Sequence, residues 1–384
     1  MSVTFPKGFV AAGVAAGLKA SGNPDVALVV NTGVTNVAAG VFTSNRIKAA
    51  PVLWTQQCLT GGAFKAVVLN SGGANACTGP AGFADTHHTA ELVAELLEVG
   101  AIEVAVCSTG LIGKRLPMEN LLSGIRDAHS NLSASGGADA ATAIMTTDSV
   151  SKTVTFESPV GWRIGGMAKG AGMLAPGLAT MLVVLTTDAV INQKDADTAL
   201  RQATRVSFDR IDSDGCMSTN DTVLLLASGS SENVAEVSEF TAALTEICLD
   251  LAHQLIADAE GSTKDIKIVV TSAASEQDAV EVARTVSRSN LLKCAIHGED
   301  PNWGRVLSAI GTTAATFEPD GIDVDFNGVA VCRFGSALPI EPEVDLSARV
   351  VEIEISLNSG TATATLWTND LSAMYVHENS AYST

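Results

Sequence analysis

The chain has 384 residues, of which 46% are hydrophobic and 17% charged, so it can bury a sizeable core in two or three domains. Its 23 basic and 42 acidic residues give a formal net charge of −19, which argues against a nucleic-acid or anionic-membrane surface and favours small-molecule partners. The seven cysteines show no C-x-x-C spacing, so a reducing cytoplasm is expected rather than a disulfide framework.

Strand-like and helix-like segments alternate along the chain. The start, PKGFVAAGVAAGLKA, is too weakly apolar to predict a signal peptide, and no run is expected to reach the length of a membrane helix. Amphipathic spacing predicts helices over about residues 81–98 and 234–259, and a third that begins at Pro117. Apolar runs predict buried strands at residues 26–30, 66–70, 104–108, 177–189, 222–228, 266–270 and 350–355.

The polar stretches between these segments complete the expected architecture. The Gly/Ser/Ala-rich residues 130–141 are expected to form a flexible loop, and the polar end YVHENSAYST a fraying tail. The class is therefore α/β or α+β, with helices covering the sheets.

The standard signatures of metal and nucleotide sites do not occur in this sequence. His87 and His88 are adjacent, which suits a solvated helix face better than a metal site, and G-x-x-x-x-G-K-[ST] and G-x-S-x-G are lacking. Small polar clusters instead follow or precede the strands. Each is compatible with ordinary turns and caps. They lie at residues 70–79, 107–113, 145–148, 217–222, 258–264 and 300–305.

Together the clusters resemble the ornithine acetyltransferase family, the glutamate N-acetyltransferases of arginine biosynthesis. The resemblance covers nearly the whole chain, and its most specific part is MAKGAGMLAPGLATMLVVLTTDA, residues 167–189. Where the family has Asn-Met before Ala-Thr, this chain has Gly177 and Leu178. We expect this departure to alter the turn without removing the function.

The resemblance implies a precursor that cuts itself between Ala179 and Thr180, giving an α chain of residues 1–179 and a β chain of residues 180–384. A threonine hydroxyl is a weak nucleophile and needs a base. The α-amino group freed at Thr180 would have a pKa close to neutral, which suits a general base. One residue would then supply both nucleophile and base.

The resemblance also implies roles for other residues. The Thr109 hydroxyl and the Gly110 N–H would form an oxyanion hole for the tetrahedral intermediate. A lysine suits the carboxylate of an amino-acid substrate, and a glutamate suits the second ammonium of ornithine. The positions that match the family's substrate-binding residues are Thr147, Lys169, Thr180, Glu260, Asn379 and Thr384.

Three further residues are expected to give support around this site. Asn220 and Asp221 are expected to brace the new amino terminus, and Arg305 to pair with a neighbouring carboxylate.

The implied fold is an N-terminal-nucleophile-like sandwich of β-sheets covered by helices, of the DmpA/ornithine-acetyltransferase type. The two chains would stay packed together and assemble as α2β2. The implied reaction is ping-pong transfer of an acetyl group from N2-acetylornithine to glutamate through an acetyl ester of Thr180. No metal and no bound cofactor is expected, and acetyl-CoA is a second donor only in the family's bifunctional members.

Three alternatives stay open at this point. A hydrolase of the same architecture, such as an aminopeptidase or amidase, would share the threonine nucleophile but pass the acyl group to water. A paralogue from secondary metabolism would act on related acetylated amino acids. A binding protein would stay uncut and catalyse nothing.

Overall fold

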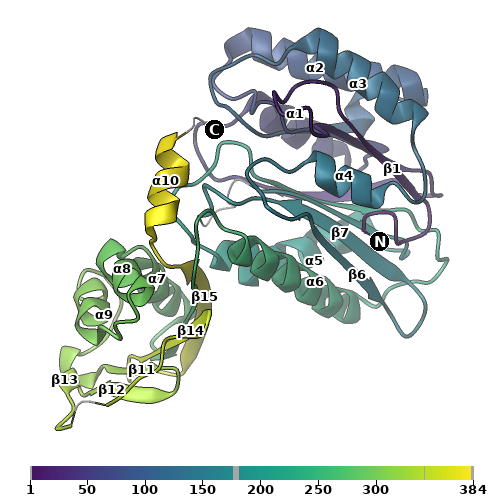
Figure 1. The fold of residues 1–384 in the computed structure, drawn as a ribbon. Helices are drawn as coiled ribbons and strands as arrows, with labels where there is room; N and C mark the ends of the chain where they lie inside the picture. The colour runs from purple at the N-terminus through teal and green to yellow at the C-terminus, as the bar shows by residue number, and fades with distance from the viewer. Residues whose placement is uncertain (1, 176–180, 341, 382–384) are drawn as a thin grey trace.

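The computed structural model of the protein describes residues 2–175, 181–340 and 342–381. Two β-sheets form the centre of the larger, N-terminal unit (Figure 1). The first has the order β1-β2-β4-β5, with only the β4–β5 pair parallel. Its strands are β1 (Phe9–Val14), β2 (Val26–Asn31), β4 (Ala66–Asn70) and β5 (Val104–Ser108).

The second sheet has the order β3-β9-β8-β7-β6, with only the β8–β9 pair parallel. Its strands are β3 (Val37–Phe42), β6 (Lys152–Glu157), β7 (Arg163–Lys169), β8 (Leu182–Thr187) and β9 (Thr222–Ala227). One face of each sheet packs on the other, and a single buried cluster contains Val29 and Leu69 from the first sheet together with Val184 and Leu224 from the second.

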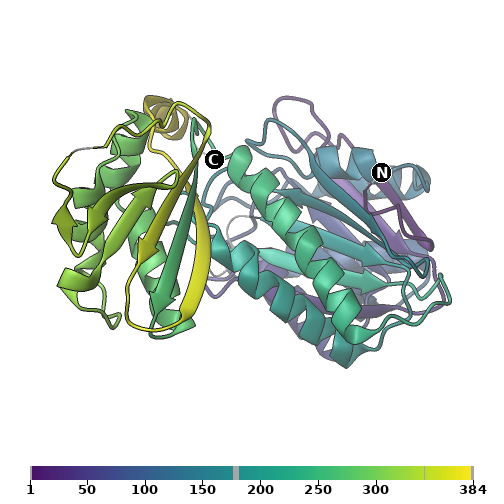
Figure 2. The same cartoon turned by 90° about the horizontal axis from the view of Figure 1, so that it is seen from below.

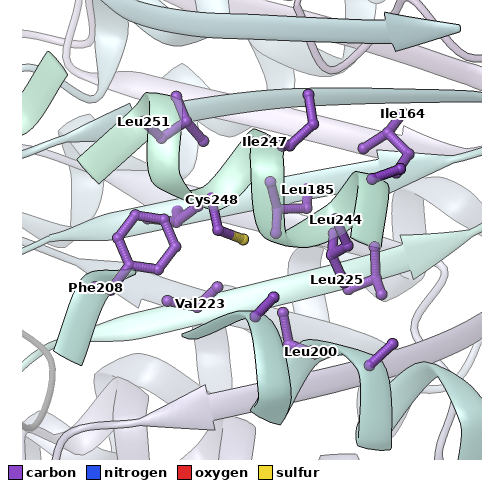
Figure 3. Packing of buried hydrophobic residues seen from close by; sticks show 14 of the residues in the cluster. Ile164, Leu185, Leu200, Phe208, Val223, Leu225, Leu244, Ile247, Cys248 and Leu251 are labelled. Carbon is purple, nitrogen blue, oxygen red and sulfur yellow. The ribbon is translucent and has the colours of Figure 1, made fainter. Parts of the chain in front are cut away.

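Helices cover the outer faces of both sheets, which gives a four-layer sandwich (Figures 1 and 2). In the outer layer on the second sheet, Leu244, Ile247 and Leu251 of α6 follow the helical repeat and point at the strands, beside Leu200 of α5 (Figure 3). The helices of this unit are α1 (Ala50–Cys58), α2 (Gly79–Leu97), α3 (Met118–Ser130), α4 (Gly137–Ala143), α5 (Gln193–Val206) and α6 (Val237–Ala257).

A smaller C-terminal unit has one six-stranded sheet, of order β13-β12-β11-β14-β10-β15, covered by three helices (Figure 2). The strands are β10 (Asp265–Ala273), β11 (Asp323–Phe326), β12 (Val329–Arg333), β13 (Ser336–Ala337), β14 (Val350–Ser356) and β15 (Ala362–Asn369). The helices are α7 (Glu276–Ser287), α8 (Asn290–His297), α9 (Trp303–Ile310) and the terminal α10 (Ala373–Ala381). Short 3-10 turns occur at η1 (Leu59–Gly61), η2 (Ala101–Glu103), η3 (Phe208–Arg210) and η4 (Pro319–Gly321).

The predicted fold class is confirmed, and the expected strands and the three expected helices form near their predicted bounds. The expected strand at 177–189 corresponds to β8, and its residues 177–180 lie outside the described residues. Two expected irregular segments are helical instead. Residues 137–143 form α4, whose alanines pack in the core between the sheets, and residues 373–381 form α10 rather than a fraying tail. Residues 137–143 contain no large apolar side chain, and those of residues 373–381 are confined to the adjacent Met374, Tyr375 and Val376, so neither sequence shows the apolar repeat of an amphipathic helix.

The expectation that no run reaches the length of a membrane helix was wrong for α6. This helix of 21 residues is long and apolar enough to cross a membrane by length and composition alone. Its apolar residues lie in the core cluster of the larger unit, as those of a helix packed on a sheet do.

Candidate active site

Five of the six polar clusters of the sequence meet at one end of the sandwich, whereas residues 300–305 lie in the smaller unit. β4 and β5 are parallel neighbours, so the segments that follow them, which begin at Ser71 and Thr109, emerge side by side. The side-chain amide of Asn220 joins both to the segment before β9, because its Nδ2 donates to Ala74 O (2.6 Å) and to Ser108 O (2.8 Å). Loops from both sheets thereby form one wall.

A pocket at this end is lined by six of the residues that the resemblance singled out. They come from β5, β7, α6 and α10, from the segments next to these elements, or from the segment between α4 and β6, and they lie far apart along the chain. The six are Thr109, Gly110, Thr147, Lys169, Glu260 and Asn379. The other three predicted residues, Ala179, Thr180 and Thr384, lie outside the described residues.

The connection between β7 and β8 carries the predicted cleavage site. These strands are antiparallel neighbours, with Lys169 opposite Leu182 at the end of the ladder nearest the pocket. Residues 176–180 belong to the connection that follows Lys169 in the chain, and the described part of it includes Gly172 and Met173 in the pocket wall.

Thr109 and Gly110 are held in place by the segment after β4. Thr109 N donates to Asn70 O (2.9 Å), and Gly73 N donates to Thr109 O (3.0 Å). Gly110 has φ +126°, and a Cβ on it would lie 2.8 Å from Gly73 N, so a larger residue would force the two segments apart. Among the described residues the Gly110 N–H has no hydrogen-bond acceptor, which leaves this donor available in the pocket.

Lys169 brings a positive charge into this wall. Its side chain is 2% exposed, and its Nζ donates to Thr109 Oγ1 at 3.3 Å and lies 4.0 Å from Asp148 Oδ2. Burial lowers the pKa of Lys169, and the charge of Lys152 lowers it further, against the opposing attraction of Asp148. The nearby carboxylates therefore decide whether this amine carries its proton.

Glu260 brings a negative charge to the pocket, and Asn379 lies beside it. Asn379 Nδ2 on α10 donates to Glu260 Oε2 at 2.9 Å, so the last described helix of the chain takes part in the site. A Cβ on Gly172 would lie 2.7 Å from the carboxyl atoms of Glu260, so a larger residue there would displace this carboxylate. Thr147 completes the wall; among the described residues its side chain has no hydrogen-bond partner.

Asp221, which was expected to brace the new amino terminus, lies next to the β7–β8 connection. Its fully buried carboxyl accepts the N–H of Met181 through Oδ1 at 3.0 Å, and burial raises its pKa well above the usual range. Arg305 lies on α9 in the smaller unit, where its guanidinium donates to Leu291 O; none of the described carboxylates pairs with it.

Two buried charged residues beside the pocket were not singled out from the sequence. Asp148 Oδ1 lies 2.7 Å from Lys152 Nζ, and the side chains of both residues are fully buried. Asp148 is the last residue of the MTTD cluster and Lys152 follows four residues later, so the only sequence signal was an ordinary acid and base pair in a polar segment.

Comparison with known proteins identifies the family. The model of the ArgJ family matches residues 10–384. A protein of Streptomyces avermitilis named arginine biosynthesis bifunctional protein ArgJ is 65% identical over 383 residues, which is 100% of both chains. A protein of the same name from Thermobifida fusca is 59% identical over 384 residues, again 100% of both chains.

The chain belongs to the ArgJ family. This confirms the family that the sequence predicted, and at the level of the family it confirms an enzyme of arginine biosynthesis. A solved structure of ornithine acetyltransferase from Mycobacterium tuberculosis, complexed with ornithine, is 62% identical to this ArgJ-family chain. The match has a TM-score of 0.45 and covers 47% of this chain and 96% of that one. The predicted cleavage and the roles of single residues stay predictions.

Proposed function

We propose that this ArgJ-family chain transfers an acetyl group from N2-acetylornithine to glutamate through an acetyl ester of Thr180, and that it gains this nucleophile by cutting itself before Thr180. The observation that carries the proposal is the pocket itself. Six residues that match the family's oxyanion and substrate positions line it together, although they range along the chain from Thr109 to Asn379.

In the first half-reaction, the freed α-amine of Thr180 takes the proton of the hydroxyl as Thr180 Oγ1 attacks the acetyl carbon of N-acetylornithine. The negative charge that forms on the acetyl oxygen is stabilised by the Thr109 hydroxyl and the Gly110 N–H. The C–N bond then breaks, the ornithine nitrogen takes a proton from the ammonium group, and the acetyl group remains as an ester. The Gly110 N–H supports this step because it has no hydrogen-bond acceptor among the described residues.

In the second half-reaction, the α-amine of glutamate attacks the ester carbon in the same oxyanion hole. The ester C–O bond breaks, Thr180 Oγ1 regains its proton, and N-acetylglutamate leaves. Lys169 suits the α-carboxylate of either amino acid, and Glu260 suits the distal ammonium of ornithine. The opposite charges of these two pocket residues support this orientation.

Self-cleavage would use the Thr180 hydroxyl on the chain's own backbone, before its α-amine is free to act as a base. Thr180 Oγ1 attacks the Ala179 carbonyl, the peptide C–N bond breaks to give an ester, and the hydroxyl proton passes to the nitrogen that becomes the α-amine. Water then releases the Ala179 carboxylate and restores the hydroxyl. We propose that two such cut molecules form an α2β2 assembly in the cytoplasm. Sedimentation of the purified protein measures the assembly.

The test of the activity is acceptor dependence. Purified enzyme is incubated with N-acetylornithine, with and without glutamate, and ornithine and N-acetylglutamate are quantified. We expect glutamate to accelerate ornithine release, with one N-acetylglutamate formed per ornithine. Equal release with and without glutamate, with acetate as the product, would instead identify an amidohydrolase.

Acetyl-CoA is proposed as a second donor because the curated relatives carry the name bifunctional protein. The same assay with acetyl-CoA in place of N-acetylornithine tests this step separately. Formation of N-acetylglutamate indicates a bifunctional enzyme, and its failure to form leaves an enzyme that only exchanges the acetyl group between the two amino acids.

A further inference from the structure

Asp148 connects two of the segments that line the pocket. Its Oδ1 accepts the N–H of Gly170 at 2.6 Å, which holds the residue after Lys169. Its Oδ2 accepts the N–H of Thr146 at 2.8 Å, which holds the residue before Thr147. The Asp148 carboxylate therefore bonds to the backbone next to two pocket residues, Thr147 and Lys169, and links their segments.

The same carboxylate is part of a buried charge network. Lys152 Nζ lies 2.7 Å from Asp148 Oδ1 and 2.5 Å from Asp258 Oδ2, and the Lys152 side chain is fully buried. Asp258 also accepts hydrogen bonds from the backbone and side chain of Ser149. Lys152 thus has two carboxylates, whereas among the described residues the ion pair of Lys169 is with Asp148 alone.

Lys169 depends on this neighbour because it is buried. An ammonium group that leaves water loses its hydration, and it stays charged only if opposite charges lie close by. The charged groups that act on Lys169 are Asp148 and Lys152 beside β6, Asp221 before β9 and Glu260 after α6, and Lys19 lies near enough to feel its charge. Of the carboxylates, Asp148 is the one within 4.0 Å.

We propose that Asp148 is a positioning residue of this site: it fixes Thr147 and Lys169 relative to each other and keeps the buried Lys169 ammonium charged, ready for a substrate carboxylate. The last clause rests on the proposed function. Asp258 pairs with the same Lys152 but has no contact with Lys169 or Gly170, so it gives a matched control for the loss of one carboxylate from this network.

The first experiment reads the charge of Lys169 directly. The protein is labelled with ¹³C at lysine Cε, the Lys169 signal is assigned by its loss in Lys169→Met, and its chemical shift is followed with pH. In Asp148→Asn the Lys169 signal should titrate at lower pH than in the wild type. In Asp258→Asn it should titrate as in the wild type.

A second variant covers the case in which Asp148→Asn does not fold. Lys152→Met keeps the length of the side chain but removes its charge, so Lys169 becomes the only cation beside Asp148. The Lys169 signal should then titrate at higher pH. No shift, or a shift to lower pH, would overturn the proposal, as would an unchanged titration in Asp148→Asn or an equal shift in Asp258→Asn.

Kinetics test the consequence for the reaction. Asp148→Asn should lower kcat/KM for N-acetylornithine by about 10- to 100-fold, mostly through KM, as expected for weakening one charge-assisted hydrogen bond. The alkaline limb of its pH profile should also move to lower pH. A wild-type enzyme that transfers no acetyl group would contradict the proposed function, and the titration of Lys169 would still decide the role of Asp148.

Discussion

The contact between Lys169 and Thr109 is the central detail at the scale of single residues. Lys169 Nζ donates to Thr109 Oγ1 at 3.3 Å, so this hydroxyl already accepts one hydrogen bond. Its own proton is then free to point at another acceptor, and among the described residues it has none. A hydroxyl held in this way is oriented before an oxyanion forms, which is what lowers the reorganisation energy of a transition state.

Replacing Thr109 by alanine should therefore slow turnover without unfolding the protein. Loss of one oxyanion donor typically raises the barrier by about 2.7–4 kcal/mol, so kcat should fall by about 10²–10³-fold. Thr109→Ser keeps the hydroxyl and should recover most of the rate. Steady-state kinetics and thermal unfolding of both variants measure this, and equal rates for wild type and Thr109→Ala would remove Thr109 from the oxyanion role.

The buried carboxyl of Asp148 predicts a specific dependence of stability on pH. Burial alone would raise its pKa, but Lys169, Lys152 and hydrogen bonds outweigh burial and hold it at about 2, below the ordinary 3.8. A lowered carboxyl pKa stabilises the fold above the unfolded value, and this stability is lost as the pH falls through the folded value. The contribution is roughly 2 kcal/mol.

The measurement is urea unfolding of the uncut Thr180→Ala chain, with and without Asp148→Asn, between pH 5 and pH 2. The free energy of unfolding lost through Asp148→Asn should be largest near pH 5 and shrink as the pH approaches 2. The carboxyl is then neutral in the unfolded state and is losing its charge in the folded state as the pH nears the folded pKa of about 2. A loss that stays constant across this range would show that the charge of Asp148 does not stabilise the fold.

At the scale of elements, small residues let α4 approach β1 closely. A Cβ on Gly136, just before α4, would lie 1.8 Å from Ala11 O, and one on Gly13 would lie 2.0 Å from Asp139 O. Both distances are far below contact, so the two elements fit together only because glycines face each other's backbone. This explains why a segment that looked like a flexible loop in the sequence is an ordered part of the core.

Gly136→Ala should consequently destabilise the fold by about 1–3 kcal/mol, the usual range for overpacking. The backbone of Gly136 has φ −73°, which alanine adopts readily, so the effect would come from the clash alone. Gly61→Ala is the control, because a Cβ there meets nothing within 4 Å. The melting temperature of Gly136→Ala should be clearly lower than that of Gly61→Ala. Similar melting temperatures would contradict the close approach of α4 to β1.

At the scale of the whole molecule, the second sheet contains strands from both sides of the predicted cut. β3, β6 and β7 precede residue 179, whereas β8 and β9 follow residue 180. β7 and β8 are neighbours over six residue pairs, and β3 pairs with β9 over another six. Breaking the bond between residues 179 and 180 removes none of these contacts.

The wild-type protein should therefore run as two bands of about half of 39.4 kDa on a denaturing gel, yet elute as one species from a native sizing column. Thr180→Ala should give one band of full length and no acetyl transfer, because nucleophile and new amino terminus are both missing. Cleavage that persists in this variant would refute Thr180 as the attacking residue. Separation of the halves on the native column would refute the shared sheet.

Local patterns were enough to predict most of the elements. Runs such as VALVV and VAVCS, and the apolar repeat of α6, bury one face or both whatever the rest of the chain does, and they became β2, β5 and α6. The family's motifs likewise predict which residues line the pocket. α4 could not be predicted in this way because a helix of small residues is stabilised by what it packs against, and α10 could not because it has no apolar repeat.

The sequence by itself determined the class of fold, the family and the residues that carry the predicted chemistry, because these depend on composition, periodicity and short motifs. Only the tertiary structure decided that Thr109, Lys169, Glu260 and Asn379 share one pocket, and that Asp148 holds Lys169 beside it. The physical reason is that burial and the distance between charges depend on the arrangement of strands and helices far apart in the chain. A carboxylate in a polar segment becomes a buried partner of two lysines only once the sheets have packed.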